Sequence, residues 1–353
     1  MHPILTQPLT PQAASLPEAL VIYPLEDVAL FEATGADALS FLQGQITNDI
    51  LSAGPEQARL AGYCTAQGRL LATMVMTALP DAPAGGLIGL MRRDILASVL
   101  KRLSMFVLRA KVKFGASTYS AVGASIAAHQ VGALTQVFGH TLPTIAWQAA
   151  STATGLWICA PTASIQPDVE TLRWWWLASE AQAALCQDLK LSQVLGTSEQ
   201  WHCQDIAAGL PWIEAATQDL LIPQTLNLDL IEGVSFTKGC YPGQEIVARS
   251  HYRGTVKRRM HFGKIDAAQT IGLKAGADIF DAQGSEQACG RVINIASSVQ
   301  SQPEGATKTG DAGTTYVLFE TTFDALEHNA LHLSAPDGAP ITLLSLPYST
   351  KPA

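Results

Sequence analysis

The hydrophobic pattern of the chain changes near Val256, and this change limits the folds that the sequence can adopt. Beyond it, short segments of alternating apolar and polar residues are separated by turns such as Pro336-Asp337-Gly338. Such segments are typical of strands in a small antiparallel barrel. The expected strands are Met260–Ile265, Ala277–Phe280, Gly290–Ala296, Thr315–Glu320, Ala330–Leu333 and Ile341–Leu346. We therefore predict a C-terminal β-barrel over residues 255–350.

Upstream of this barrel, the pattern mixes strands and helices. Ala61–Thr65 and Leu70–Thr77 flank a turn that contains Gly68, which predicts a β-hairpin. The segment Arg92–Met105 carries apolar residues on one helical face, and Val107–Phe114 again has the pattern of a strand. This order predicts an α+β region with helices on one side of an antiparallel or mixed sheet.

From about Val122 the mixed pattern repeats in outline and includes three consecutive tryptophans. A helix is expected from Pro167 to Cys186, and Trp174, Trp175 and Trp176 lie within it. Neighbouring residues on a helix are about 100° apart, so the three indoles cannot share one helical face. We expect one or two of them in the core and one at an interface or a ligand surface.

Length and composition indicate a large folded protein. The chain has 353 residues, which suggests two to three domains, and its hydrophobic fraction of 48% with 15% charged residues excludes a disordered protein. The 22 basic and 30 acidic residues give a net charge of -8, which argues against a protein that coats nucleic acid. No direct nucleic-acid partner is expected, although a local basic site remains open.

The sequence also predicts where the protein resides. Residues 1–19 form an expected flexible leader without the features of a secretory signal or a mitochondrial transit peptide. The longest apolar stretch, Leu70–Leu79, is shorter than the ~18 to 20 residues of a membrane span. The six cysteines contain no C-x-x-C pair, which favours a reducing compartment. We expect a cytoplasmic protein with no membrane association and no metal site.

The richest chemistry lies in residues 238–245, Lys-Gly-Cys-Tyr-Pro-Gly-Gln-Glu, which we call the signature segment. Pro242 is expected in the first turn of a helix that runs towards Gly254, which places Cys240 just ahead of a helix N-terminus. The helix dipole and the charge of Lys238 would favour the thiolate form of the sulfur. Cys240 is therefore a candidate nucleophile or soft ligand. A capped helix preceded by a buried small residue is the alternative interpretation.

Two further features flank this segment. Trp201 lies in a short expected helix upstream and offers an aromatic face on which a flat bicyclic ligand could stack. Downstream, Arg249 and Arg253 belong to a basic cluster within an acidic chain. Guanidinium groups suit the carboxylates of an anionic ligand, but cations also complement a helix C-terminus, so both interpretations stay open.

The signature segment resembles the Lys-Gly-Cys-Tyr/Phe-x-Gly-Gln-Glu motif of the YgfZ-type folate-binding family. All seven fixed positions of that motif are present. The resemblance extends over nearly the whole chain. It includes Phe41–Asp49, Gly209-Leu210-Pro211, Ile222-Pro223-Gln224 with Asn227, and Leu346–Ser349.

The resemblance implies a fold and a function. The related T-protein of the glycine cleavage system has two interlocked α+β subdomains and a C-terminal barrel around a central opening, and here residues 20–254 would form the two subdomains. The family implies binding of tetrahydrofolate or a one-carbon derivative, and support of iron–sulfur cluster assembly or repair in other proteins, including enzymes that modify tRNA. The expected partners are folate and iron–sulfur client or assembly proteins, and the protein is expected to be a monomer.

The resemblance also implies the site residues. A family tryptophan of the folate site matches Trp201, whereas a second one matches Val28, so half of the aromatic clamp is absent. Cys240 is the candidate catalytic residue. Residues expected to contact folate are Val28, Trp201, Lys238, Gly239, Tyr241, Gly243, Gln244, Glu245, Arg249 and Arg253.

Three functions stay open at this point. A folate-dependent aminomethyltransferase is disfavoured because Ala72 and Thr73 stand where the related enzymes carry an acidic residue after the hairpin glycine. A folate-independent thiol oxidoreductase would depend on Cys240 alone. In the leading hypothesis Cys240 is a nucleophile, a redox thiol or a transient cluster ligand, and a partner must supply the other cluster ligands. Whether the protein is an enzyme is left open.

Overall fold

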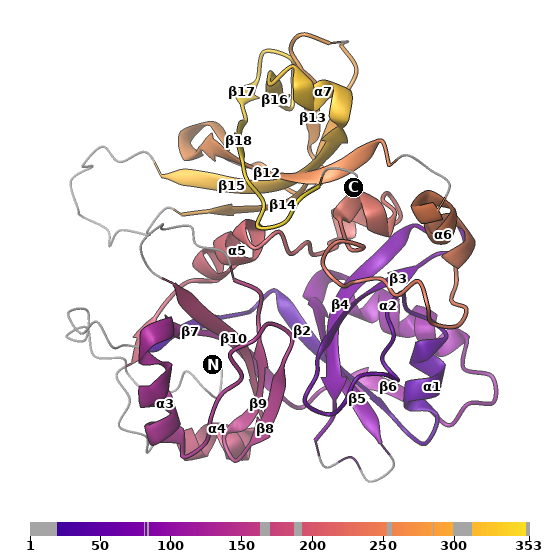
Figure 1. Cartoon of the computed structure of the whole chain (residues 1–353), viewed down its shortest axis with the longest axis vertical. Helices are drawn as coiled ribbons and strands as arrows, with labels where there is room; N and C mark the ends of the chain where they lie inside the picture. Colours follow the sequence, from indigo (N-terminus) through magenta and orange to yellow (C-terminus); the bar gives the residue numbers. More distant parts are fainter. Residues whose placement is uncertain are drawn as a thin grey trace.

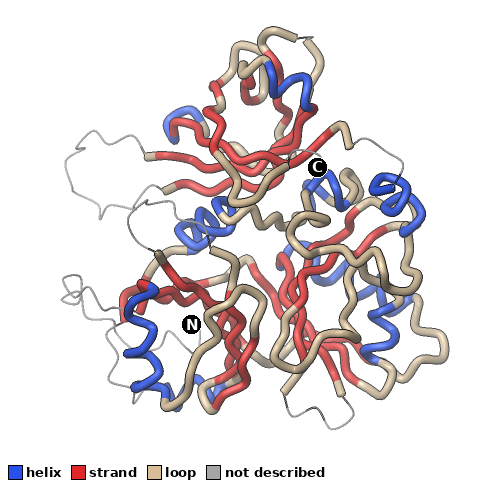
Figure 2. Tube along the Cα trace, in the orientation of Figure 1, coloured by secondary structure: helices blue, strands red, loops and turns tan. Residues whose placement is uncertain are grey.

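The computed structural model describes residues 20–80, 82, 85–162, 170–186, 193–252, 256–284, 286–298 and 313–350. Within these residues the chain forms three sheets, seen as three groups of strands in Figures 1 and 2. The expected leader lies outside the described residues, as does Arg253. The predicted boundary between residues 254 and 255 falls there too and stays a prediction.

The first sheet has six strands in the order β11-β1-β7-β10-β9-β8. Its strands are β1 (Leu20–Pro24), β7 (Ser120–Ala127), β8 (Ala149–Thr152), β9 (Gly155–Cys159), β10 (Thr171–Ala178) and β11 (Gln193–Leu195). The helices of this part are η3 (Ala128–Gln130), α3 (Val131–Phe138) and α4 (Glu180–Cys186). Only the pair β1 and β11 is parallel, so the sheet is mixed, as expected.

The second sheet has five strands in the order β3-β4-β5-β2-β6. Its strands are β2 (Val28–Thr34), β3 (Arg59–Cys64), β4 (Leu70–Ala78), β5 (Gly86–Arg92) and β6 (Lys113–Ala116), and its helices are α1 (Ala38–Gln43) and α2 (Arg93–Met105). The predicted hairpin is β3 and β4, and Gly68 in its turn has a φ of 74°, a value that favours glycine. Val107–Phe114 was predicted as a strand, but β6 begins only at Lys113.

The two subdomains interlock because the chain moves between their sheets. Strand β1 lies in the six-stranded sheet, β2 to β6 build the five-stranded sheet, and the chain then returns to the first sheet with β7. The two sheets stand side by side beneath the barrel in Figure 1. This arrangement agrees with the α+β architecture that the sequence predicts.

The third sheet is the predicted barrel, in the order β17-β16-β13-β14-β15-β12-β18. Its elements are β12 (Arg258–Asp266), η6 (Ala267–Gln269), β13 (Asp278–Asp281), β14 (Gly290–Ser297), β15 (Thr314–Thr322), α7 (Phe323–Glu327), β16 (Leu331–Leu333), β17 (Ala339–Pro340) and β18 (Thr342–Leu344). The strands at the two ends of this order, β17 and β18, are separated by Ile341 alone. The sheet therefore curls until its ends meet and forms a nearly closed barrel.

The segment between the six-stranded sheet and the barrel holds short helices. They are α5 (Ser198–Ala207), η4 (Ala215–Thr217), η5 (Pro223–Leu226) and α6 (Gln244–Tyr252). Helix α5 begins with a capping box between Thr197 and Gln200, and it lies directly below the barrel in Figure 1. Arg259 at the start of β12 donates to both oxygens of Asp229, at 2.5 and 2.9 Å, and so attaches the barrel to the region after η5.

The tryptophan run corrects the sequence analysis, because residues 171–178 form strand β10 rather than a helix. Successive strand side chains point to opposite faces, so Trp175 packs in the larger core while Trp174 and Trp176 pack in a second core with Trp157. All three indoles are buried in the cores, so none lies at the interface or ligand surface that was expected for one of them. Strand β10 runs between β7 and β9, and both faces of the sheet are covered there.

No helix in the described part of the chain is long and apolar enough to cross a membrane.

Candidate functional site

The signature segment is held against the N-terminal subdomain by Lys238. Its Nζ atom donates to the carbonyl oxygens of Gln43 and Ile46, the latter at 2.6 Å, and it lies 5.1 Å from the ring centroid of Tyr241. Burial lowers the pKa of Lys238 from 10.5 to about 8, although the charge of Asp49 acts in the opposite direction. The amine thus points into the subdomain and joins two blocks that the sequence resemblance singled out.

Cys240 lies in the opposite environment. The residue is exposed and precedes α6 by four positions, since that helix begins at Gln244 rather than at Pro242. The Lys238 amine, which was expected to act on the thiol, is instead bonded to buried carbonyl oxygens. The structure therefore presents Cys240 as an accessible thiol at the surface of the signature segment, and its chemical role stays a prediction.

Two glycines bring the hairpin turn against the signature segment. Gly243 has a φ of 82°, and a Cβ atom added there would lie 2.5 Å from the Cα of Gly68 and 2.5 Å from the carbonyl oxygen of Thr65. No side chain fits at that distance, so the close approach requires glycine. Gly239, in contrast, would place a Cβ atom in open space.

The remaining predicted residues of this segment lie on or beside α6. Gln244 and Glu245 form the first helical turn, and Arg249 lies in the last turn, where it is exposed. Tyr241 is buried, and burial raises the pKa of its hydroxyl. Their contacts with folate stay predictions.

Trp201 lies in the core, on α5. Its ring is fully buried and lies 5.6 Å from the ring of Tyr23 and 6.1 Å from that of Trp175, measured between centroids, while the guanidinium carbon of Arg173 lies 4.7 Å from its centroid. A Cβ atom on Gly123 would lie 2.3 Å from the same ring. The faces of Trp201 are therefore covered by protein, and a stacked ligand would have to displace one of these contacts.

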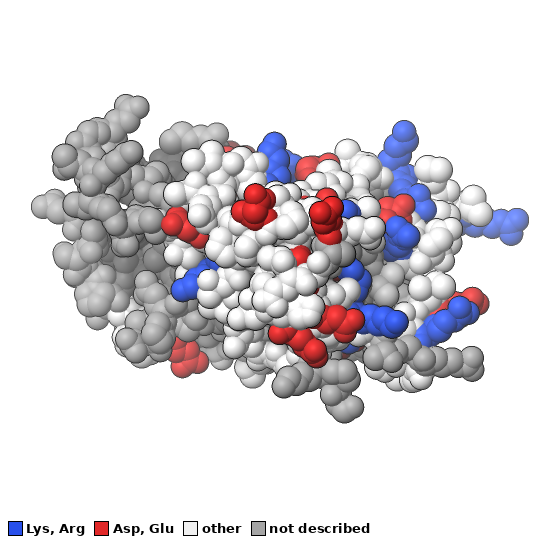
Figure 3. Space-filling view, turned by 90° about the horizontal axis from the view of Figure 1, so that it is seen from above, with Lys and Arg blue, Asp and Glu red and all other residues white. Residues whose placement is uncertain are grey.

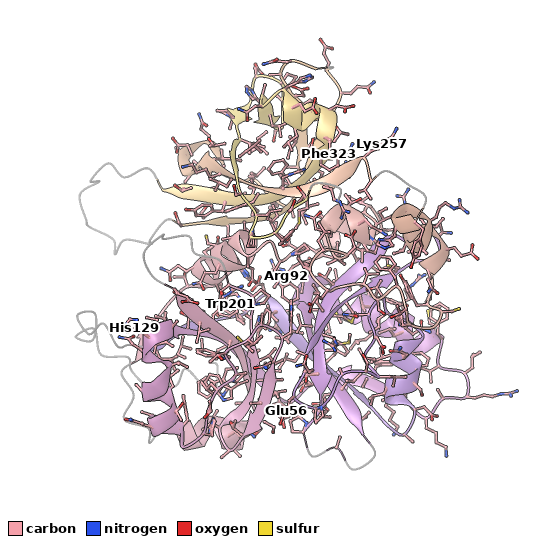
Figure 4. All side chains as sticks on the ribbon, viewed as in Figure 1. Glu56, Arg92, His129, Trp201, Lys257 and Phe323 are labelled. Atoms are coloured by element: carbon pink, nitrogen blue, oxygen red, sulfur yellow. The ribbon has the colours of Figure 1, made fainter. Side chains whose placement is uncertain are left out.

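Val28 begins β2 beside a group of charged residues that the sequence analysis missed. It pairs in register with Arg92 at the end of β5 and follows Asp27. We call Asp27, Arg92, His202 and Glu214 the central cluster. Figure 4 shows Arg92 and Trp201 near the middle of the molecule, between the barrel and the two lower sheets.

Short contacts join the members of the central cluster. Arg92 donates to Oδ2 of Asp27 and, over 2.8 Å, to Oε1 of Glu214, while Nε2 of His202 lies 2.8 Å from the same Asp27 oxygen. Asn294 of β14 also donates to Oε1 of Glu214, over 3.0 Å. The cluster thus joins the five-stranded sheet, α5 and the barrel.

The electrostatics of the cluster keep Asp27 ionised. Burial by itself would raise the pKa of this carboxyl, but the hydrogen bond to His202 and the charges of His202 and Arg92 outweigh burial and lower the pKa from 3.8 to about 2. Its second oxygen, Oδ1, is buried and has no hydrogen-bond partner. A buried carboxylate oxygen without a donor carries a free-energy cost, which the contacts of the other oxygen with Arg92 and His202 offset.

A pocket of about 320 Å³ opens at this place. It is lined by Asp27, Arg92, Arg93, Asp94 and Glu214. Its volume falls within the range of small-molecule sites. The only sequence signal for this pocket was the presence of charged residues next to the ends of apolar strands. Those residues come from separate parts of the chain, so the sequence did not reveal that they meet.

The central cluster and the signature segment are separate groups. Gly68 contacts Gly243 of the signature, whereas Thr73, five residues further along the hairpin, accepts a hydrogen bond of 2.9 Å from the backbone N–H of Ile213, next to Glu214. Five strand residues span about 16 Å. Strand β4 therefore runs from the signature segment towards the central cluster. The hydroxyl of Thr73 is already bonded to the backbone N–H of Ile213.

The basic residues after the signature segment are divided between structural pairs and the surface. Arg258 is paired with Glu320 and Arg259 with Asp229. Figure 3, viewed from the barrel side, shows Lys and Arg gathered towards one end of the face with acidic side chains among them. The visible face is of mixed charge.

Metal binding finds no support in the described ranges, which contain no group of three or more His, Cys, Asp or Glu side chains that could hold an ion. An iron–sulfur cluster at Cys240 would need ligands from elsewhere.

Comparisons with known proteins place the chain in a family. No family model matches it. It is 33% identical over 278 residues to the tRNA-modifying protein YgfZ of Serratia proteamaculans, covering 76% of this chain and 80% of that protein. It is 34% identical over 263 residues to the protein of the same name from Yersinia pseudotuberculosis, covering 72% and 75%.

A solved structure supports the fold. The glycine cleavage system aminomethyltransferase T from Bartonella henselae matches with a TM-score of 0.64 over 93% of this chain and 86% of that one, at 13% sequence identity. The T-protein-like architecture predicted from the sequence is thereby confirmed. Together with the relatives of similar sequence, this shows that the chain belongs to the YgfZ family.

Proposed function

We propose that the chain binds tetrahydrofolate, or a one-carbon derivative of it, with the pterin ring in the pocket of the central cluster. The observation that carries this proposal is the pocket itself, which the carboxylates of Asp27 and Glu214 line together with Arg92. The edge of a pterin presents an amino group and a ring N–H side by side, and two such donors match a carboxylate. The low pKa of Asp27 keeps this acceptor charged at neutral pH.

Binding of the folate would serve tRNA modification. The relatives in the family are named tRNA-modifying proteins. We propose that the chain acts through iron–sulfur enzymes, whose clusters it helps to assemble or repair, rather than by holding the tRNA itself. Cys240 is exposed and could contact a partner's cluster or react with a thiol, whereas Asp27 and Glu214 would orient the folate. The cytoplasmic location and the monomeric state stay predictions.

A folate-independent thiol oxidoreductase is the second candidate, and the exposure of Cys240 is the observation in its favour. Aminomethyl transfer has less support. Neither Ala72 nor Thr73 carries a carboxylate. Ala72 is buried, and the Thr73 hydroxyl already accepts a hydrogen bond from the backbone N–H of Ile213.

Calorimetric titration with tetrahydrofolate under reducing conditions tests the proposal. We expect saturable binding to the wild type, binding at least about tenfold weaker in Asp27→Asn because a charge-assisted hydrogen bond is lost, and unchanged binding in Cys240→Ser. Glu214→Gln provides a second weakened variant, and Asp324→Asn, an exposed aspartate on α7, is the control. No binding to the wild type would refute the folate role and favour the oxidoreductase.

The cellular role needs a separate measurement. In cells that lack the gene, we expect the wild type to restore tRNA nucleosides whose modification depends on iron–sulfur enzymes, and we expect Cys240→Ser and Asp27→Asn to restore them poorly. Restoration by Cys240→Ser as complete as by the wild type would exclude the thiol from the function.

A further inference from the structure

A second pocket, of about 400 Å³, lies where the hairpin turn and the segment before η5 meet the barrel. Three arginines line it, Arg69 from the hairpin turn, Arg258 from β12 and Arg291 from β14, and we call it the arginine pocket. Its other lining residues are Leu220, Leu221, Ile222, Thr225, Asp278, Ala288, Gly290 and Glu320. Three arginines against two carboxylates leave an excess positive charge.

The protein uses only part of the hydrogen-bonding capacity of these guanidinium groups. Arg258 donates through Nε and Nη2 to Glu320, at 2.6 and 3.0 Å. Arg291 makes one bond of 3.1 Å to Asp278, and Arg69 makes one of 3.1 Å to the carbonyl oxygen of Asp219. Since each guanidinium carries five N–H donors, most donors of Arg69 and Arg291 remain for a ligand.

One of the unused donors is buried. The Nε atom of Arg291 is inaccessible to solvent and has no acceptor in the protein. A buried N–H donor without an acceptor costs free energy, as does the buried Asp27 oxygen, which is an acceptor without a donor. The excess positive charge of the arginine pocket and the remaining donors of Arg69 and Arg291 favour an anion that offers several acceptor oxygens.

The apolar lining narrows the kind of anion. Leu220, Leu221 and Ile222 also line the pocket, so the ligand should carry its charge on a stem with apolar groups. A chain of γ-linked glutamates has this composition, with a carboxylate on each unit and methylene and amide groups between them.

The arginine pocket also lies within reach of the central cluster. Arg291 lines the arginine pocket, and Asn294 on the same strand donates to Glu214 of the central cluster. A bulge between Val292 and Asn294 shifts the register of β14 against β15. Three strand residues span about 10 Å, and the segment from Glu214 to Leu220 also connects the two pockets. An extended folate has a comparable length between its pterin and its glutamate.

We propose that the arginine pocket binds the carboxylates of the γ-glutamyl tail of a folate whose pterin occupies the central pocket. This inference rests on the proposed folate binding and assigns the tail to Arg69 and Arg291, not to Arg249 on α6. Folates with several glutamates are then the preferred ligands of the protein.

The test compares tetrahydrofolate carrying one glutamate with the same compound carrying three. We expect the triglutamate to bind the wild type about tenfold or more tightly than the monoglutamate. In the double variant Arg69→Gln, Arg291→Gln this gain should fall below about threefold, while monoglutamate binding should change less. Both side chains are at least partly exposed, so the variant should fold, which an unchanged Tm would verify. Arg109→Gln, an exposed arginine outside both pockets, is the control.

The possible failures are distinguishable. If the wild type binds folate but gains nothing from added glutamates, or if the gain is lost in Arg249→Gln instead, the arginine pocket is not the tail site although the folate role stands. Free γ-triglutamate provides a probe without a pterin, and its binding to the wild type but not to the double variant would support the pocket even without folate binding. Tighter binding of inorganic phosphate than of γ-triglutamate would overturn the assignment.

Discussion

Asp27 shows how a single residue gains its role from neighbours that are distant in the sequence. Its carboxylate is held by Arg92 and His202, and one of its oxygens is left without a donor. The sequence could not indicate this, because Asp27 is a charged residue in the turn before a strand and its partners lie 65 and 175 positions later.

The pH dependence of stability should reveal this environment. The folded pKa of Asp27 is about 2, below the ordinary 3.8, so its contribution is complete above about pH 4 and disappears as the pH falls towards 2. The free energy of unfolding of the wild type minus that of Asp27→Asn, from urea titrations between pH 6 and 2.5, should therefore be positive near neutrality and shrink below pH 4. A difference that stays constant over this range would show that Asp27 is not stabilised as a carboxylate.

At the residue scale, the sequence indicates which side chains can do chemistry, but it does not indicate where those side chains point. The chemistry of the signature segment was recognisable from its composition, but the adjacency of Lys238 and Cys240 did not reveal that the amine turns inward to the carbonyls of Gln43 and Ile46. Side-chain direction depends on the loop conformation and on what packs against it. Neither was encoded locally.

At the scale of elements, the hairpin turn and the start of α6 meet through two glycines. The sequence predicted each element separately, because a strand pair around a glycine and a helix after a proline have local signals. The contact between Gly68 and Gly243 has no such signal, although both glycines were visible.

This contact predicts the effect of Gly243→Ala. The alanine would adopt a left-handed backbone conformation and would place its methyl group 2.5 Å from the Cα of Gly68, so we expect a loss of at least about 2 kcal/mol of unfolding free energy. Gly239→Ala, where the added carbon meets open space, should change stability little. Urea denaturation of both variants is the measurement, and equal stabilities would contradict the close packing.

The tryptophan run shows where reasoning about elements fails. The sequence analysis expects a helix over Trp174 to Trp176, although bulky aromatics favour strands and strand β10 buries both of its faces. A strand with two buried faces lacks the alternation by which strands are recognised. The predicted barrel strands lie near the observed ones, because turn residues separate them clearly in the sequence.

At the scale of the whole molecule, Asn294 attaches the barrel to the segment that follows α5. Its side chain accepts from the backbone N–H of Trp212 at 2.8 Å and donates to the carbonyl oxygen of Trp212 at 2.9 Å and to Glu214 at 3.0 Å. The overall architecture followed from the change in pattern near Val256 and from the family motif. The contacts of Asn294 with Trp212 and Glu214, which attach the barrel to the rest of the chain, could not be predicted from the sequence. They depend on how complete elements pack against one another.

Loss of these contacts should weaken both stability and ligand binding. Asn294→Ala leaves the Trp212 backbone groups and one Glu214 contact without their partner in a buried place, so we expect a loss of about 2 to 4 kcal/mol and weaker folate binding. Gln269→Ala, an exposed amide on η6, is the control. Stability and folate affinity both equal to the wild type would mean that the barrel does not support the central cluster.

The most direct test of the account is a crystal structure of the protein with 5-formyltetrahydrofolate, a stable one-carbon folate. We predict the pterin ring in the central pocket, with its amino edge about 2.7 to 3.2 Å from a carboxylate oxygen of Asp27. A pterin bound elsewhere, without a hydrogen bond to Asp27, would contradict the central claim.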